Sequence, residues 1–283
     1  MFADRLRLCL NWILFTIKLR NKNEEVSESS KKGHTLCNVM DTEHRICVAI
    51  RIRPPLERER YDTTCARRMD DGCSIVMTNN EDHSTTSFGF DFCFDESDDQ
   101  RGIYEEAVQE MVDAGLQGNN ATIFTYGQTG SGKTYTILGN MSEGGSLSAE
   151  SGLFLRVFGD LFEYRRRVAS KAHVLISLSA VELYVEDVMD LLSNKAKIRL
   201  RDSGDETLLT GLNRVEVNDM RDVMRQFRVA NSFRSVAATK MNDASSRSHA
   251  LFFIDIFQVP LESMDMIRAA VGTKASMNSS LSS

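Results

Sequence analysis

Eight consecutive residues near the middle of the chain have the types and the spacing of a phosphate-binding loop. They fit the pattern G-x-x-x-x-G-K-[ST] and are Gly127, Gln128, Thr129, Gly130, Ser131, Gly132, Lys133 and Thr134. Glycines allow a tight turn that directs several backbone N–H groups inward, towards the oxygens of a phosphate. Lys133 would place a positive charge beside the outer phosphates, and the hydroxyl of Thr134 suits the Mg²⁺ that accompanies a nucleotide. The sequence therefore predicts a nucleotide-phosphate site.

The segments on either side of this loop support the same interpretation. Residues 121–126 are β-branched and aromatic, as in a buried strand, and residues 135–138 can continue a helix. A strand, a glycine-rich loop and a helix follow one another in this order in phosphate loops. The alternative is a glycine-rich turn without a ligand, and the flanking segments favour the phosphate site.

The rest of the chain alternates between strand and helix patterns. Strands are predicted at 46–52, 73–78, 87–94, 174–185 and 249–259, short strands within 198–217, and helices at 100–116, 152–167 and from the cap Asp219 to about residue 236. Such alternation around a phosphate loop predicts an α/β fold of three layers, with a mostly parallel central sheet and helices on both faces. The nucleotide should lie at the carboxyl ends of the strands.

The composition is that of a soluble globular protein. The chain has 283 residues, of which 42% are hydrophobic and 26% charged, enough for one large α/β domain. The net charge of −6 gives no support for nucleic-acid binding, which usually requires a basic excess. The six cysteines form no C-x-x-C pair and no zinc-like spacing, so reduced thiols in a cytosolic protein are expected.

The first 44 residues look separate from the rest of the chain. Leu8 to Ile17 is an apolar run between basic residues, and it is too short for a membrane span of about 20 residues. A signal peptide is one alternative, although no small-residue cleavage site comes after the run. A short docking or stray helix is preferred, and residues 21–33 read as a polar linker. We therefore expect residues 1–44 to be a poorly ordered extension, and no membrane partner.

A second polar cluster could serve a nucleotide site. A nucleotide hydrolase needs groups that sense the terminal phosphate and orient a water molecule. Residues 242–249 read Asn-Asp-Ala-Ser-Ser-Arg-Ser-His and lie between a predicted helix and a predicted strand. Alone they would be read as a polar connector, but beside a phosphate loop a phosphate-sensing role is favoured.

With these two clusters, the sequence resembles the motor domain of kinesins. Residues 118–136 are similar to the family's G-x-N-x-T-I-F-x-Y-G-Q-T-G-S-G-K-T-Y-T, and residues 242–249 to its first switch, N-x-x-S-S-R-S-H. Residues 51–54 resemble R-x-R-P, residues 88–94 resemble F-x-F-D-x-V-F, and residues 182–192 resemble E-I-Y-N-E-x-V-x-D-L-L. These five stretches occur in the family's order and cover about residues 45–257.

The resemblance implies a P-loop NTPase fold that binds ATP and Mg²⁺, hydrolyses ATP and moves along microtubules in the cytoplasm, as part of the cytoskeleton. Lys133 and the loop amides would hold the β- and γ-phosphates, and Thr134 and Ser246 would lie near Mg²⁺. The catalytic residues implied are Asn242, Ser245, Ser246 and Arg247, and those on the adenine side are Arg51, Arg53, Pro54 and Tyr135.

The chain departs from the family pattern after residue 259. Kinesins carry a second switch, D-L-A-G-S-E, on the next strand, whereas residues 261–270 read Leu-Glu-Ser-Met-Asp-Met-Ile-Arg-Ala-Ala. Asp265 is a candidate for the Asp, but no Gly or Glu comes after it at the family's spacing, which leaves Arg247 without its counter-charge. Residues 277–281 again resemble a family motif, I-N-x-S-L, which indicates a deletion through the second switch. We therefore expect a motor domain over residues 45–283 that is incomplete at its C-terminal end.

Two functions of different classes stay open. The first is an ATP-driven microtubule motor domain, and the second is a non-motile nucleotide-binding protein with impaired hydrolysis, because the D-x-x-G of the second switch is missing. A phosphate-loop NTPase unrelated to microtubules is a third alternative, which the five ordered motifs disfavour. Microtubules are the expected partner, weakened by the missing C-terminal part, and nucleic acid is not expected.

Overall fold

The computed structural model describes most of the chain between residues 46 and 263 and one segment near the N-terminus. The described residues are 13–20 (backbone), 46–59, 65–79, 82–141, 146–202, 204, 207–235 and 248–263. The chain divides into two units, a larger one of residues 1–22 and 104–283 and a smaller one of residues 23–103.

A single sheet runs through the larger unit, in the strand order β10-β9-β8-β14-β1-β7, with β13 paired to β8. Its strands are β1 (Ile13–Arg20), β7 (Ala121–Thr125), β8 (Ala172–Tyr184), β9 (Asp187–Asp190), β10 (Ala196–Lys197), β13 (Val215–Glu216) and β14 (Ser248–Pro260). A separate hairpin joins β11 (Arg199–Asp202) to β12 (Thr207–Thr210). The 13-residue strands β8 and β14 pair along their whole length and form the centre of the sheet.

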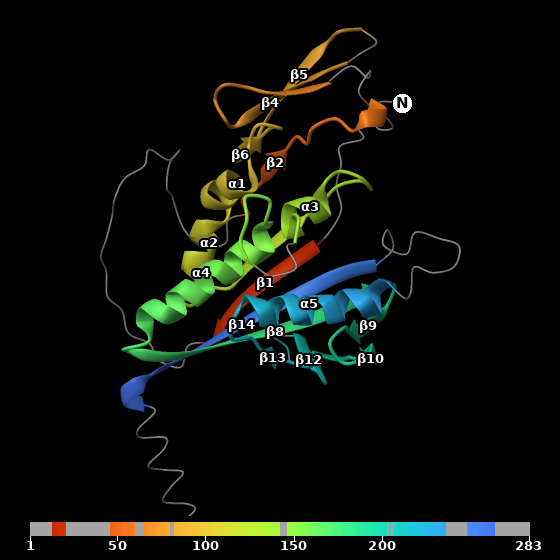
Figure 1. Ribbon diagram of the computed structural model, residues 1–283. Helices are drawn as coiled ribbons and strands as arrows, with labels where there is room; N and C mark the ends of the chain where they lie inside the picture. The colour runs from red at the N-terminus through yellow and green to blue at the C-terminus, as the bar shows by residue number, and fades with distance from the viewer. Residues whose placement is uncertain are drawn as a thin grey trace, which may run out of the picture. The chain divides into compact units, whose positions relative to one another are not determined.

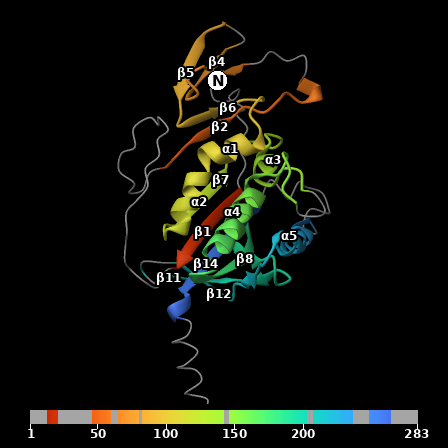
Figure 2. The ribbon, with the colours of Figure 1, turned by 60° about the vertical axis from the view of Figure 1, so that its left-hand side comes forward.

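Four helices of this unit lie in one layer (Figures 1 and 2). They are α2 (Gln109–Leu116), α3 (Lys133–Leu138), α4 (Leu153–Val168) and α5 (Met220–Ser235). In this layer α3 lies at the end of α4 (Figures 1 and 2). The central helix, α4, contacts the other three and β8, while α2 and α3 contact β1 and β7. α1 (Gln100–Ala107) crosses the boundary between the two units.

The core of the larger unit is built around α4. Its apolar residues recur at helical spacing and therefore line one face, which is buried against the sheet. Phe154 is completely buried and lies 5.1 Å from Phe158 and 5.2 Å from Phe252, measured between ring centroids. Phe227 of α5 lies 6.0 Å from both Phe154 and Phe252. The cluster thus joins α4, α5 and β14.

The smaller unit contains a parallel pair and a three-stranded antiparallel sheet. β2 (Ala49–Arg51) pairs with β6 (Phe92–Phe94), and β4 (Ser74–Thr78) lies between β3 (Ala66–Arg68) and β5 (Thr85–Gly89). A 3-10 turn, η1, spans Glu57–Glu59.

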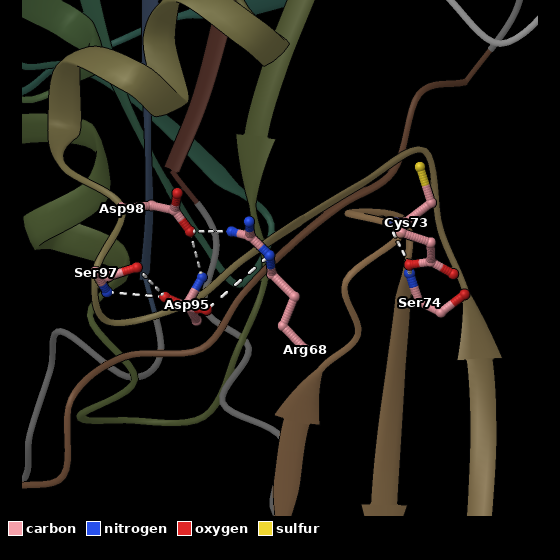
Figure 3. Close-up of polar contacts among 7 residues, drawn as sticks. Arg68, Cys73, Ser74, Asp95, Ser97 and Asp98 are labelled. Carbon is pink, nitrogen blue, oxygen red and sulfur yellow. Dashed lines mark hydrogen bonds and ion pairs between the residues drawn. The ribbon is translucent and has the colours of Figure 1, made fainter.

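Polar contacts hold the connections of this unit in place (Figure 3). Arg68 donates to the carboxylate of Asp98 at 2.5 Å, and that carboxylate also accepts the backbone N–H of Asp95 at 2.7 Å. Asp71 accepts the backbone N–H groups of Cys73 and Ser74 at 2.9 and 2.8 Å. The turns before β4 and after β6 are therefore fixed by carboxylates.

Three expectations about the fold were wrong. The sheet is not mostly parallel among the described strands of the larger unit, where β1–β14 is the one parallel pairing. The reason is local for β8 and β9, because a connection of two residues, Val185 and Glu186, can only join antiparallel strands. The predicted helical layer on the second face is not found among the described residues.

The third error concerns the helix predicted near the N-terminus. Of the extension expected to be poorly ordered (residues 1–44), the structure describes residues 13–20, and these form β1. The prediction of a helix over Leu8 to Ile17 is therefore wrong from residue 13 onward. The periodicity of a short apolar run does not distinguish a helix from a strand. Here the segment is a strand because it pairs with β14 on one edge and β7 on the other.

Candidate nucleotide-binding site

The predicted phosphate loop lies between the end of β7 and the start of α3, in the order that the sequence indicated. α3 begins at Lys133, and the preceding Gly132 has φ 92°, while Gly130 has φ 84°. Both values lie in the left-handed region, where a side chain would strain the backbone. These two glycines are thus required by the conformation of the loop.

Lys133 is the charged group of this loop, and its side chain is directed back across it. The ammonium donates to the carbonyl oxygen of Gln128 at 2.5 Å and lies 3.4 Å from the hydroxyl of Ser131. The residue is only 8% exposed. A phosphate in the loop would therefore meet a cation that is already fixed in place, and Thr134 lies next to it on the exposed surface of the first turn of α3.

The donors present fit a nucleotide phosphate and a hard cation. An ammonium and loop amides suit phosphate oxygens, and the hydroxyls of Ser131 and Thr134 suit Mg²⁺. At the base of the loop, the hydroxyl of Thr125 is buried and has no hydrogen-bond partner among the described residues. A buried hydroxyl without a partner is costly, and a bound group or water would relieve this cost.

Two glycines also set the junction of the helices behind the loop. A Cβ on Gly152 would lie 2.4 Å from the carbonyl oxygen of Ile137, and one on Gly139 would lie 2.0 Å from that of Glu150. The backbones meet here in a bridge between Gly139 and Ser151, supported by the N–H of Asn140 donating to Glu150 at 2.9 Å. The bridge closes the base of the connection between α3 and α4.

Tyr135, expected on the adenine side, is one-third exposed on α3. Its hydroxyl contacts the carboxylate of Glu150, so the ring is held by the connection between α3 and α4. Sequence reasoning did not identify Glu150, which lies in a polar stretch with no motif.

The other three adenine-side residues belong to the smaller unit and lie together at the end of β2. Arg51 donates to Gln100 at 2.9 Å, and Arg53 binds Glu59 through both terminal nitrogens, at 2.7 and 2.9 Å. Arg53 also donates to the carbonyl oxygen of Pro54. Arg53 therefore shapes the turn that presents the exposed Pro54 ring, a role that the motif alone did not reveal.

The first-switch residues lie outside the described part of the chain, and so does Asp265. These residues are Asn242, Ser245, Ser246 and Arg247. The flanking elements are described, because α5 ends at Ser235 and β14 begins at Ser248.

A group of charged residues, of which Glu182 is buried and Arg234 and Lys195 are half-buried, lies next to these two ends. One terminal guanidinium nitrogen of Arg234, in α5, donates to the carbonyl oxygen of Ser248 at 3.4 Å. The Nε of Arg234 has no hydrogen-bond partner among the described residues. Burial lowers the pKa of Arg234, and the nearby carboxylate of Glu182 acts in the opposite direction. Glu182 is 3% exposed and pairs with Lys195 at 2.8 Å. The signal was available in the sequence, since Glu182 is the one charged residue within the apolar strand pattern at 174–185.

The family model for the kinesin motor domain matches residues 51–278. This chain belongs to the kinesin motor-domain family. The match includes the phosphate loop and the polar cluster at 242–249, and it begins after β1. None of the helices in the described part of the chain is long and apolar enough to cross a membrane.

Curated kinesin-like proteins are similar over about three quarters of the chain. Kinesin-like protein KIF22 of Xenopus tropicalis is 35% identical over 221 residues, covering 75% of this chain and 34% of its own length. Kinesin-like protein KIF27 of Mus musculus is 34% identical, covering 76% and 15%. Kinesin-like protein KIN-12E of Arabidopsis thaliana is 36% identical, covering 74% and 17%. The chain thus spans about a third or less of the length of these relatives.

A solved structure of a fast kinesin has the same fold. It superposes with a TM-score of 0.63 at 24% identity, covering 75% of this chain and 64% of that chain. The prediction of an α/β P-loop NTPase fold of the kinesin type is therefore confirmed, apart from the direction of the strands and the second helical layer.

Proposed function

We propose that residues 45–283 of this chain are a kinesin motor domain that binds ATP with Mg²⁺ at the loop 127–134. The observation that carries the proposal is Lys133, a buried cation held inside a glycine-rich loop between β7 and α3. The family match adds the expected substrate, because ATP turnover coupled to movement along microtubules is what the kinesin resemblance implies. The expected location is accordingly cytoplasmic, on the microtubule cytoskeleton.

The expected site residues have the following roles in this proposal. Lys133 exchanges the carbonyl oxygen of Gln128 for a phosphate oxygen, a stronger charge-assisted contact. Thr134 and Ser246 would offer hydroxyls to Mg²⁺, which when bound would neutralise charge on the outer phosphates. Asn242 and Ser245 orient the water that attacks the γ-phosphate in line, which releases ADP and inorganic phosphate. The kinesin resemblance also implies adenine-side roles for Arg51, Pro54 and Tyr135.

The second candidate is a non-motile member of the family that holds nucleotide without productive turnover. It is favoured by the sequence after β14, where residues 261–270 lack the D-x-x-G of the second switch. Without that segment the γ-phosphate loses one of its sensors and Arg247 loses its counter-charge, so binding would persist while hydrolysis slows.

Binding is tested by replacing the loop lysine in the full chain. We expect Lys133→Ala to weaken Mg-ATP binding about 10- to 100-fold, because a hydrogen bond to a charged group contributes about 1.5–3 kcal/mol. The measurement is a titration with a fluorescent ATP analogue. The matched control is Lys171→Ala, which removes an exposed lysine elsewhere in the same unit. An unchanged affinity in Lys133→Ala would refute the site.

Turnover separates the two candidates. We expect microtubule-stimulated phosphate release by the full chain to be well below that of a complete kinesin motor domain assayed beside it, with microtubule co-sedimentation measured in parallel. A stimulated rate equal to that of the complete domain would reject the non-motile candidate and would show that Asp265 and its neighbours rebuild the switch.

A further inference from the structure

The phosphate-loop strand is joined to the rest of its sheet through the N-terminal segment. In the described part of the chain, β7 has one strand neighbour, β1, and β1 in turn pairs with β14. The pairing with β7 is antiparallel, from Ile13 opposite Thr125 to Ile17 opposite Ala121, so every residue of β7 has a partner. The pairing with β14 is parallel and continues over all eight residues of β1 (Figure 1).

We propose that residues 13–20 are a tether that fills a strand slot between β14 and β7 and thereby positions the phosphate loop. The slot has two backbone edges, and a strand edge left open inside a sheet presents unpaired N–H and C=O groups at considerable cost. Its occupant must be an extended segment that can pair on both sides. The pairing registers identify that occupant as the chain's own residues Ile13–Arg20.

Two observations distinguish the tether from the part of the chain that matches the kinesin family. The kinesin family match begins at residue 51, so β1 lies outside it. Among the described residues no strand comes after β14, and the place beside β14 is taken by a segment from the other end of the chain. The sequence of β1, ILFTIKLR, is rich in β-branched and apolar residues and contains neither glycine nor proline, as a central strand requires.

The tether reaches the base of the loop. Its first residue, Ile13, is opposite Thr125, which ends β7 two residues before Gly127. Apart from β1, the main elements that contact β7 in the described structure are the helices α2 and α3, so losing β1 would loosen β7. The loop would then be correctly placed for only a fraction of the time, and apparent ligand affinity falls by that fraction. This consequence for nucleotide affinity rests on the proposed function, whereas the pairing itself does not.

Hydrogen exchange on full-length variants tests the pairing without any ligand. Ile17 is paired with both Ala121 and Ile254, and Ile17→Pro removes its N–H and disrupts the ladder. We expect the amides of residues 121–125 to exchange at least about 10-fold faster in this variant, with the β8–β9 hairpin unchanged. Ile17→Val, which keeps the N–H and the β preference, should behave like the wild type. Unchanged protection of β7 in Ile17→Pro would overturn the proposal.

The positioning role is tested on the same two variants. Mg-ATP affinity should fall at least about 10-fold in Ile17→Pro and stay at the wild-type value in Ile17→Val. Faster exchange of β7 with unchanged affinity would overturn the positioning role. If the wild type binds no nucleotide, the proposed function fails, and hydrogen exchange still decides on the tether.

A disulfide cross-link between β1 and β7 tests the pairing even if the Ile17→Pro variant does not fold. Thr16 is opposite Thr122, and antiparallel partners have Cα separations of about 4.5–5.5 Å, within the range of a disulfide. We expect Thr16→Cys/Thr122→Cys to form that disulfide under mild oxidation, as mapped by mass spectrometry. The control is Thr16→Cys/Thr210→Cys, whose second site lies in the separate β11–β12 hairpin. Cross-linking no greater than in the control would overturn the proposal.

Discussion

In the smaller unit, the pKa of Asp95 is lowered mainly by one neighbouring hydroxyl. The side chain and the backbone N–H of Ser97 both donate to its carboxylate, at 2.6 and 2.9 Å, and Arg68 lies at 4.0 Å (Figure 3). These contacts lower the pKa of Asp95, with the Ser97 hydroxyl as the largest cause. The folded pKa is below the unfolded value of about 3.9, so the contribution to stability is present above about pH 4 and is lost as the pH falls further.

Replacing that hydroxyl should be visible in a titration. We expect Ser97→Ala to raise the pKa of Asp95 towards its ordinary value, because one of the two donors to the charged form is gone. The measurement is an NMR titration of the Asp95 carboxyl carbon. Ser170→Ala, at an exposed position in the other unit, is the control. Superimposable titration curves for Ser97→Ala and wild type would contradict the assignment.

At the same scale, the loop residues were predictable and their partners were not. The loop pattern could be recognised because its residues are contiguous, and the structure has positive φ at Gly130 and Gly132 and a helix beginning at Lys133. The partners of Arg53 and Tyr135 could not be found, because Glu59 and Glu150 reach them through turns whose geometry no motif specifies.

Among the elements, α3 and α4 depend on the close approach of their backbones at Gly152. We expect Gly152→Ala to lower the free energy of unfolding by about 1–3 kcal/mol, because its Cβ would overlap backbone atoms that cannot rotate away. Thermal and denaturant unfolding measure the change. Gly89→Ala is the control, since a Cβ there meets nothing within 4 Å. Equal stability of the two variants would contradict the steric argument.

Long elements were predicted more successfully than short or unusual ones. β8, β14 and α4 are long and strongly patterned, and the structure places them within a few residues of the predicted ranges. β1 was missed, because its role depends on edges offered by strands more than 100 positions away in the sequence. No periodicity within the segment itself carries that information.

For the larger unit as a whole, the aromatic cluster at Phe154 is the main point of connection between helices and sheet. We expect Phe154→Ala to cost about 3–5 kcal/mol, a large share of the roughly 5–15 kcal/mol that stabilises a typical domain. Phe88→Ala, which truncates a 40% exposed ring, should cost much less. Chemical denaturation followed by circular dichroism compares them. A small loss in Phe154→Ala would show that the cluster is not the core.

At this scale the fold class was predictable and the sheet was not. Strand and helix patterns suffice to indicate an α/β architecture around a phosphate loop. The direction of a strand depends on the length of the connection before it, as the β8–β9 turn shows. Which strands lie next to each other depends on which strand edges are available for pairing, as the position of β1 between β14 and β7 shows.

The bridge between Gly139 and Ser151 has a practical consequence for engineering. Its contacts hold together the two ends of the connection from Met141 to Glu150. They therefore offset the entropic cost of closing that loop. Lengthening a closed loop adds only about 0.6 kcal/mol for each doubling. A tag or fluorescent reporter inserted after Met141 should therefore leave α3, α4 and the phosphate loop in place.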